Sequence, residues 1–284
     1  MKSGTTLLHK LLSHHPDIYM SAQKEPCFFV DQLQLRALQP WLWSQGYWRS
    51  QDVYLELFKP GADKAYVGES SVYYTHLPLA TGVPERIKRF SPDARLIYIV
   101  RDPVERTISH YWHRVMYNNE CRSIEHAIKF DSQYRDVSYY AMQLAPYYGV
   151  FGRHQVKILT LEELLEDCDQ TLKSIFRWLG IDDRISLPQL TYYNDTPAII
   201  RQRIELVDDF LNKLKNYTIL RRSLSIVPES IKNAGLQMFT RKINRMDVDV
   251  EPVVDYLRPL QREQTKELCL LTGRAFREWR TINS

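Results

Sequence analysis

The chain has a short polar turn, Lys2-Ser3-Gly4-Thr5-Thr6, directly before an apolar, helix-like run. The first backbone N–H groups of a helix have no intrahelical partner and carry the positive end of its dipole. A phosphate can bind there, because Gly4 allows close approach and Lys2 adds a full positive charge. The order differs from the Walker pattern, since the lysine precedes the glycine. An ordinary helix start capped by Ser3 or Thr5 is the alternative interpretation.

Composition limits the class of protein. The 284 residues are long enough for one large α/β domain or two small ones. Their composition, 44% hydrophobic and 25% charged, is ordinary for a soluble globular protein. The net charge of +4 is compatible with anionic ligands and too small to indicate nucleic acid. Four scattered cysteines without C-x-x-C spacing favour a reducing compartment over a zinc site or disulfides. With no visible signal peptide and no apolar run of roughly 18 residues, we expect a cytoplasmic protein without a membrane span.

Apolar runs predict buried parallel strands. Residues 96–100 (LIYIV) are almost continuously apolar and end at Arg101, where open α/β sheets place ligand-binding groups. Further strands are predicted at 18–20, 65–68 and 156–160. Helices are predicted at 5–14, 84–90, 103–117, 135–148, 161–179, 199–216 and 253–271.

One element of such a fold is not found in the sequence. A phosphate-binding loop in an α/β fold normally follows a buried strand. Here only Met1 precedes Lys2. We therefore expect a central sheet from which the N-terminal strand is missing, either through a truncated start or because another element fills the gap.

Several blocks together resemble the sulfotransferase family that uses 3′-phosphoadenosine 5′-phosphosulfate (PAPS). Residues 2–6 are similar to its 5′-phosphosulfate loop, and residues 100–111 (VRDPVERTISHY) to its 3′-phosphate block. Lys24-Glu25-Pro26-Cys27-Phe28-Phe29 resembles the acidic motif of the heparan-type branch. Residues 176–180 and 271–279 also resemble family segments. The heparan-type branch often has a lysine at the position of Ser70, and this departure argues against heparan as the acceptor.

The resemblance implies a P-loop NTPase-like, three-layer α/β fold with a central parallel sheet. It implies one sulfotransferase domain over residues 1–284, with a lid or capping loop at 220–250. For the cofactor it implies that Arg101 and Ser109 bind the 3′-phosphate; Ser109 follows about two helical turns later. A salt bridge of Arg101 to Asp102 or Glu105 is the alternative. The predicted cofactor-binding residues are Lys2, Ser3, Gly4, Thr5, Thr6, Arg101, Ser109, Asn194 and Thr196.

Three residues are implied as catalytic. Lys2 would stabilise the charge that grows on the bridging oxygen. Glu25 would be the general base, with its pKa raised by the aromatic and proline surroundings. A surface glutamate paired with Lys24 is the alternative for Glu25. Glu69, a second acid, would share the base role or position Lys24.

The predicted function is transfer of a sulfuryl group from PAPS to an acceptor hydroxyl, which releases 3′-phosphoadenosine 5′-phosphate (PAP) without a metal. A small molecule or secondary metabolite is the expected acceptor, and a carbohydrate is the alternative that the Glu25 block favours. An inactive PAP-binding relative is the alternative of another class, suggested by the abrupt start at Lys2. No nucleic-acid partner is expected.

Overall fold

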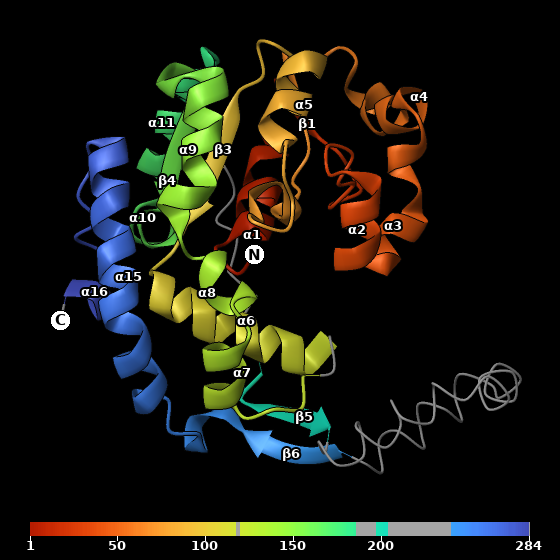
Figure 1. Cartoon of the computed structure of the whole chain (residues 1–284). Helices are drawn as coiled ribbons and strands as arrows, with labels where there is room; N and C mark the ends of the chain where they lie inside the picture. Colours follow the sequence, from red (N-terminus) through yellow and green to blue (C-terminus); the bar gives the residue numbers. More distant parts are fainter. Residues whose placement is uncertain (118–119, 186–196, 204–239, 284) are drawn as a thin grey trace, which may run out of the picture. The chain divides into compact units, whose positions relative to one another are not determined.

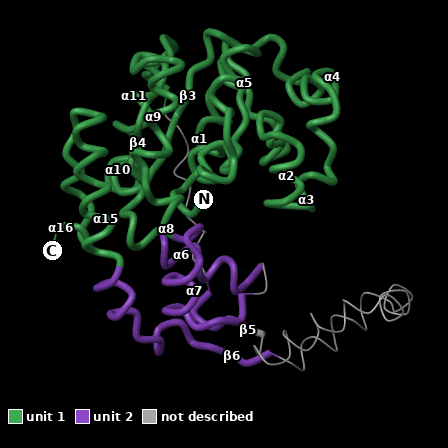
Figure 2. The backbone as a smooth tube through the Cα atoms, viewed as in Figure 1, with its two compact units in different colours: residues 1–106, 135–193, 257–284 green, residues 107–134, 194–256 purple. Residues whose placement is uncertain are grey.

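The computed structural model describes residues 1–117, 120–185, 197–203 and 240–283 (Figure 1). The chain separates into two compact units (Figure 2). The first consists of residues 1–106, 135–193 and 257–284, and the second of residues 107–134 and 194–256. The predicted single domain over 1–284 stays a prediction. The division falls within the helices α6 (Pro103–Tyr117), α8 (Gln133–Asp136) and α15 (Glu251–Thr272).

Four strands of the first unit form two parallel pairs. β1 (Ile18–Met20) pairs with β2 (Tyr66–Gly68), and β3 (Leu96–Val100) pairs with β4 (Val156–Thr160). The predicted strands at 18–20, 96–100 and 156–160 are confirmed, and the one at 65–68 begins one residue later. Parallel pairing requires crossover connections, which are largely helical here. The predicted P-loop-like α/β class is therefore confirmed.

Helices make up most of the rest of this unit. The expected helix at 161–179 is two helices, because the Asp167 carboxylate accepts the Gln170 N–H (3.0 Å) and starts a new helix. The helices that lie wholly in the unit are α1 (Thr5–Leu12), α2 (Gln32–Leu38), α3 (Pro40–Gln45), η1 (Tyr47–Arg49), α4 (Gln51–Leu55), η2 (Glu56–Gly61), η3 (Val72–Thr75), α5 (Val83–Phe90), α9 (Tyr140–Phe151), η4 (Arg153–Gln155), α10 (Leu161–Glu166), α11 (Cys168–Leu179) and α16 (Arg280–Asn283).

The hydrophobic core of the first unit fixes α1. An isolated helix of eight residues is marginal in water, so its apolar face must supply the stability. Each buried leucine contributes about 1.5–3 kcal/mol. The core joins α1 to β1, β3, β4, α10 and α11 through Leu7, Leu8, Leu11, Leu12, Ile18, Ile99, Leu159, Leu164, Leu172, Ile175 and Phe176. The polar turn in front of α1 is therefore anchored to the centre of the unit.

A cavity of about 590 Å³ lies in the first unit, and both β2 and β3 line it. Among the described residues, β2 pairs only with β1 and β3 only with β4. The central sheet that the sequence predicts is therefore divided into two pairs, β1–β2 and β3–β4. The cavity lies next to β2 and β3. Residues 66–68 and 96–99 all contribute to its wall.

The second unit contains an antiparallel pair. β5 (Ile199–Arg203) pairs with β6 (Thr240–Asn244), so that Ile199 lies opposite Asn244. The expected helix at 199–216 is therefore wrong at its start, because a distant segment supplies hydrogen-bond partners in a ladder. Residues 240–247 of the predicted lid form β6 and η5 (Arg245–Asp247), and residues 220–239 lie outside the described residues.

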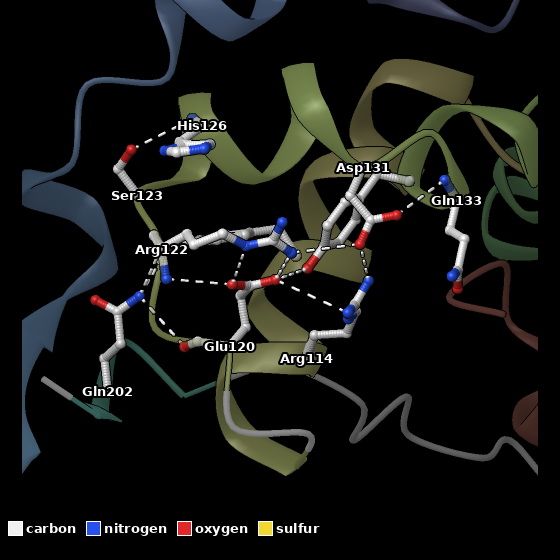
Figure 3. Close-up of polar contacts among 10 residues, drawn as sticks. Arg114, Glu120, Arg122, Ser123, His126, Asp131, Gln133 and Gln202 are labelled. Atoms are coloured by element: carbon white, nitrogen blue, oxygen red, sulfur yellow. Dashed lines mark hydrogen bonds and ion pairs between the residues drawn. The ribbon is translucent and has the colours of Figure 1, made fainter. Parts of the chain in front are cut away.

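A partly buried ion-pair network joins α6 to the segments that flank α7 (Ile124–Phe130) within the second unit (Figure 3). The Glu120 carboxylate accepts hydrogen bonds from Arg122 (2.6 and 2.8 Å) and from the Tyr134 hydroxyl (2.7 Å). Asp131 lies 2.8 Å from Arg114 and 3.3 Å from Arg122. Burial works to raise the pKa of Glu120, but these hydrogen bonds hold it below its ordinary value. The positive and negative charges of the network balance one another, and its role is structural.

No helix within the described ranges is long and apolar enough to cross a membrane.

Candidate active site

The loop before α1 has the backbone shape of an anion site. Lys2 (φ 64°) and Gly4 (φ 87°) are both left-handed, and a Cβ on Gly4 would lie 2.6 Å from Leu161 Cδ1. Gly4 is the N-cap residue and has no side chain to cap the helix. The alternative of a cap by Ser3 or Thr5 is therefore wrong, and the first N–H groups of α1 have no capping side chain. These groups can take a phosphate.

Lys24 adds a cation at this helix start. Its Nζ donates to Thr6 Oγ1 over 2.8 Å. Burial lowers the pKa of Lys24, and the charge of Glu25 opposes that effect. The sequence suggested Lys24 only as a partner of an acid. The structure instead joins it to a residue of the predicted phosphosulfate loop.

Glu25 is held beside the loop by the second acidic block. Its Oε2 accepts the Val72 N–H (2.8 Å), and its own N–H donates to the Ser70 carbonyl (3.0 Å). Glu25 itself is left-handed (φ 59°). Burial raises the pKa of its carboxyl, as expected, although the Val72 hydrogen bond and the Lys24 charge act in the opposite direction. A raised pKa suits a general base that works near neutral pH.

Glu69 has both carboxylate oxygens engaged. The Tyr74 hydroxyl donates to Oε1, and Ser71 Oγ donates to Oε2 over 2.8 Å. Ser71 Oγ in turn accepts the Cys27 N–H (3.1 Å), which ties Glu69 to the turn that carries Glu25. Burial raises the pKa of Glu69 to about 7. These contacts tie Glu69 to the turn that carries Glu25, and both of its predicted roles, sharing the base role and positioning Lys24, stay predictions.

Replacing Glu69 with glutamine should flatten the pH dependence of folding stability. The folded-state pKa of about 7 exceeds the ordinary 4.5, so the folded state holds a proton that the unfolded state releases. The stability that this group contributes is therefore present below pH 4.5 and lost as the pH rises through about 7. The full loss is on the order of 3 kcal/mol.

Thermal unfolding between about pH 5 and pH 8 measures this effect. Glu166→Gln, which changes an exposed glutamate of the same unit, is the matched control. Its stability should change with pH as steeply as that of wild type. An equal change of stability with pH in wild type and Glu69→Gln would contradict the raised pKa of Glu69.

Arg101 is paired with Glu105 in this structure. Its Nη2 and Nε lie 2.7 and 3.3 Å from Glu105 Oε2. Asp102 is buried and makes a different contact, because its Oδ2 accepts the Thr281 N–H (2.9 Å). The Arg101 carbonyl accepts the hydroxyl of Tyr140 (2.7 Å), a residue that also lines the cavity.

Three further residues were predicted to bind the cofactor: Ser109, Asn194 and Thr196. Ser109 lies on α6, half-buried, in the second unit, whereas Arg101 lies in the first. Asn194 and Thr196 lie outside the described residues. The proposed sharing of the 3′-phosphate between Arg101 and Ser109 stays a prediction.

The cavity connects several of the predicted residues. Ser3, Thr5 and Glu69 line it, and Glu25 is held next to it by Ser70 and Val72, which also line it. Sequence reasoning assigned no site role to His9 or Arg106, which also line the cavity, because their partners come from distant elements and leave no spacing signal.

Among residues 1–117, 120–185, 197–203 and 240–283, no group of three His, Cys, Asp or Glu side chains could hold a metal ion. The expected metal-free reaction stays a prediction.

The model of the sulfotransferase family matches residues 1–184, more than half of the chain. The chain belongs to the sulfotransferase family. Heparan sulfate glucosamine 3-O-sulfotransferase 3A1 of Mus musculus is 26% identical over 204 residues, which cover 69% of this chain and 47% of that protein. Heparan sulfate glucosamine 3-O-sulfotransferase 5 of Mus musculus is 23% identical over 218 residues, 72% and 58% of the two chains. This family member thus spans about half the length of the curated relatives it matches.

A solved structure shows the fold. The crystal structure of a sulfotransferase from Alicyclobacillus acidocaldarius superimposes with a TM-score of 0.64 and 24% identity. The match covers 98% of this chain and 95% of that one. The sulfotransferase fold therefore extends beyond residues 1–184.

Proposed function

We propose that the chain transfers a sulfuryl group from PAPS to an acceptor hydroxyl and releases PAP. The observation that carries the proposal is the helix start at Thr5, which has no capping side chain and has Lys24 bound to Thr6. Helix N–H groups, hydroxyls and an ammonium group suit a phosphosulfate. Glu25, with its raised pKa, lies on the turn that carries Lys24. The relatives named above support the same reaction class.

The residues can divide the chemistry as follows. Bound PAPS supplies a sulfur that bonds to the acceptor oxygen while its bond to the 5′-phosphate oxygen breaks. Glu25 takes the proton of the acceptor hydroxyl, since its carboxylate must be ionised to accept it. Lys2, Lys24 and the N-terminus of α1 stabilise the negative charge that grows on the 5′-phosphate. Arg101 holds the 3′-phosphate after leaving Glu105.

A carbohydrate is the acceptor that the relatives support, because both carry heparan sulfate glucosamine in their names. A small aromatic molecule is the second candidate, because Tyr54, Phe58 and Phe90 line the cavity. Aromatic rings of this kind can pack against a flat ligand. A cytoplasmic location remains a proposal that rests on the scattered cysteines.

Calorimetric titration of the chain with PAP tests the cofactor site without any acceptor. We expect saturable binding that Thr6→Val weakens by about five- to tenfold, because one hydroxyl and the Lys24 contact are lost. Ser174→Ala removes a hydroxyl on α11 that donates to Thr171 (2.7 Å) and is the matched control. Transfer of labelled sulfate from PAPS to a panel of sugars and phenols then tests the reaction. Absence of PAP binding would refute the proposed function.

A further inference from the structure

A serine and a buried histidine form a pair beside Glu25. His9, on α1, is 7% exposed, and its Nδ1 lies 2.9 Å from Ser70 Oγ. Its Nε2 lies 3.1 Å from the carbonyl oxygen of Ser21. The backbone N–H of Glu25 donates to the carbonyl of Ser70 (3.0 Å). The Ser70 side chain is thereby fixed next to the residue that we assign as the general base.

The direction of each hydrogen bond follows from the donor inventory. A carbonyl oxygen can only accept, so His9 Nε2 must carry a proton. Nδ1 of the neutral ring is then an acceptor, and the Ser70 hydroxyl must donate to it. Burial and the nearby charge of Lys24 lower the pKa of His9, which favours the neutral ring that this hydrogen-bond pattern requires.

This arrangement decides what Ser70 can offer to a ligand. With its only proton directed at His9, Ser70 Oγ presents lone pairs alone. It can therefore accept a hydrogen bond from a ligand hydroxyl or amine, but it cannot donate to a sulfate or a carboxylate. Turning the hydroxyl towards an anion would leave the buried Nδ1 of His9 without a partner, which is costly.

We propose that Ser70 is a specificity-determining residue that accepts a hydrogen bond from an unsulfated, hydroxyl-bearing sugar, and that His9 is the positioning residue that holds it in this role. Both residues line the cavity, and Ser70 is half-buried, so its oxygen can be reached. The inference rests on the proposed function and narrows its acceptor class. A sulfate group on the acceptor would gain no hydrogen bond from Ser70, so an acceptor sulfated at the position that faces Ser70 should bind more weakly than the unsulfated one.

The first experiment measures acceptor binding to the PAP-loaded chain. The probes are N,N′-diacetylchitobiose and the same disaccharide with a 6-O-sulfate, titrated by calorimetry. We expect the unsulfated disaccharide to bind at least about fivefold more tightly, the effect of one satisfied hydrogen bond. Equal affinity, tighter binding of the sulfated form, or no binding of either overturns the proposal. PAP binding, measured beforehand without a sugar, separates this failure from failure of the proposed function.

The second experiment uses variants of the pair. Ser70→Ala and His9→Ala should each weaken binding of the unsulfated disaccharide by about fivefold. In Ser70→Ala, the His9→Ala change should have no further effect, because the two residues act as one unit. Ser70→Thr keeps the hydroxyl and should restore affinity. Additive losses, or an unchanged affinity in Ser70→Ala, overturn the proposal.

Two readouts separate positioning from a general structural effect. In sulfate transfer, Ser70→Ala should raise KM about fivefold and leave kcat within about twofold, since the contact binds acceptor without taking the proton. Nitrogen-15 spectra of the ring should show neutral His9 with the proton on Nε2. A proton on Nδ1 overturns the proposal, because Ser70 would then be the acceptor of the His9 hydrogen bond.

Discussion

Replacing Glu25 with glutamine should lower kcat by about 10²- to 10⁴-fold, the usual effect of removing a general base. Glutamine has nearly the same shape, and its amide oxygen can still accept the Val72 N–H that Glu25 accepts at 2.8 Å. The turn should therefore keep its conformation, and PAP affinity should change by no more than about twofold. The expected result is an enzyme that binds its cofactor with nearly unchanged affinity and turns over far more slowly.

The pH profile adds a second test of Glu25. Burial raises its pKa, so the ionised and active form should be lost at a higher pH than for an exposed glutamate. The acid limb of kcat in wild type should follow that raised pKa, and the residual activity of Glu25→Gln should lack it. Glu166→Gln, on an exposed glutamate, should behave as wild type. Normal turnover in Glu25→Gln would mean that another group is the general base. A parallel assay of Glu69→Gln would show whether Glu69 is that group.

Local sequence patterns predicted most of the elements. The run at 96–100 forms β3 at the predicted bounds; Ile99 and Val100 are buried, whereas residues 96–98, which line the cavity, are half-buried. Gly180 ends α11 in the left-handed conformation, as the position of a glycine after an apolar helix predicts. The polar turn at residues 2–6 leads into α1, which begins at Thr5 as predicted. The interactions that end α11 lie within a few residues of one another, whereas β3 also needs hydrogen bonds from the distant β4.

Contacts between distant segments could not be predicted in the same way. Residues 199–203 were predicted to start a helix, yet they form β5, because β6 supplies the ladder partners. Asp102 seemed a candidate partner for Arg101, but it receives hydrogen bonds from Thr281 at the other end of the chain. No spacing rule connects residues 179 positions apart. The same reason hid the pair of His9 and Ser70.

The arrangement around Glu25 and Glu69 shows how two acids can acquire different roles. Glu69 is enclosed by hydroxyl donors, with Tyr74 and Ser71 on its two oxygens. The carboxylate of Glu25 instead accepts a backbone N–H, that of Val72, at Oε2. The resemblance assigned the base role to Glu25 and left Glu69 to share that role or to position Lys24, but it could not predict which donors surround each carboxylate, because these come from residues 71–74.

Replacing Arg101 with alanine should weaken PAP binding by about 10- to 100-fold. Hydrogen bonds to a charged group contribute about 1.5–3 kcal/mol, and each 1.4 kcal/mol is a factor of ten in affinity. In this structure the guanidinium is paired with Glu105 (2.7 Å), a half-exposed pair of modest strength. A phosphate with two charges should therefore displace Glu105. Arg101→Lys keeps the positive charge but lacks the guanidinium fork, so its affinity for PAP should lie between those of wild type and Arg101→Ala.

The 3′-phosphate itself provides the decisive comparison. Adenosine 5′-phosphate lacks that group, so Arg101→Ala should leave its affinity within about twofold while the affinity for PAP falls. Glu105→Gln should bind PAP at least as tightly as wild type, because it frees Arg101 from its partner. Arg153→Ala, which removes an exposed arginine of the same unit, controls for net charge. An equal loss for both nucleotides, or a loss in Glu105→Gln, would mean that the Arg101–Glu105 pair supports the fold and does not recognise the 3′-phosphate.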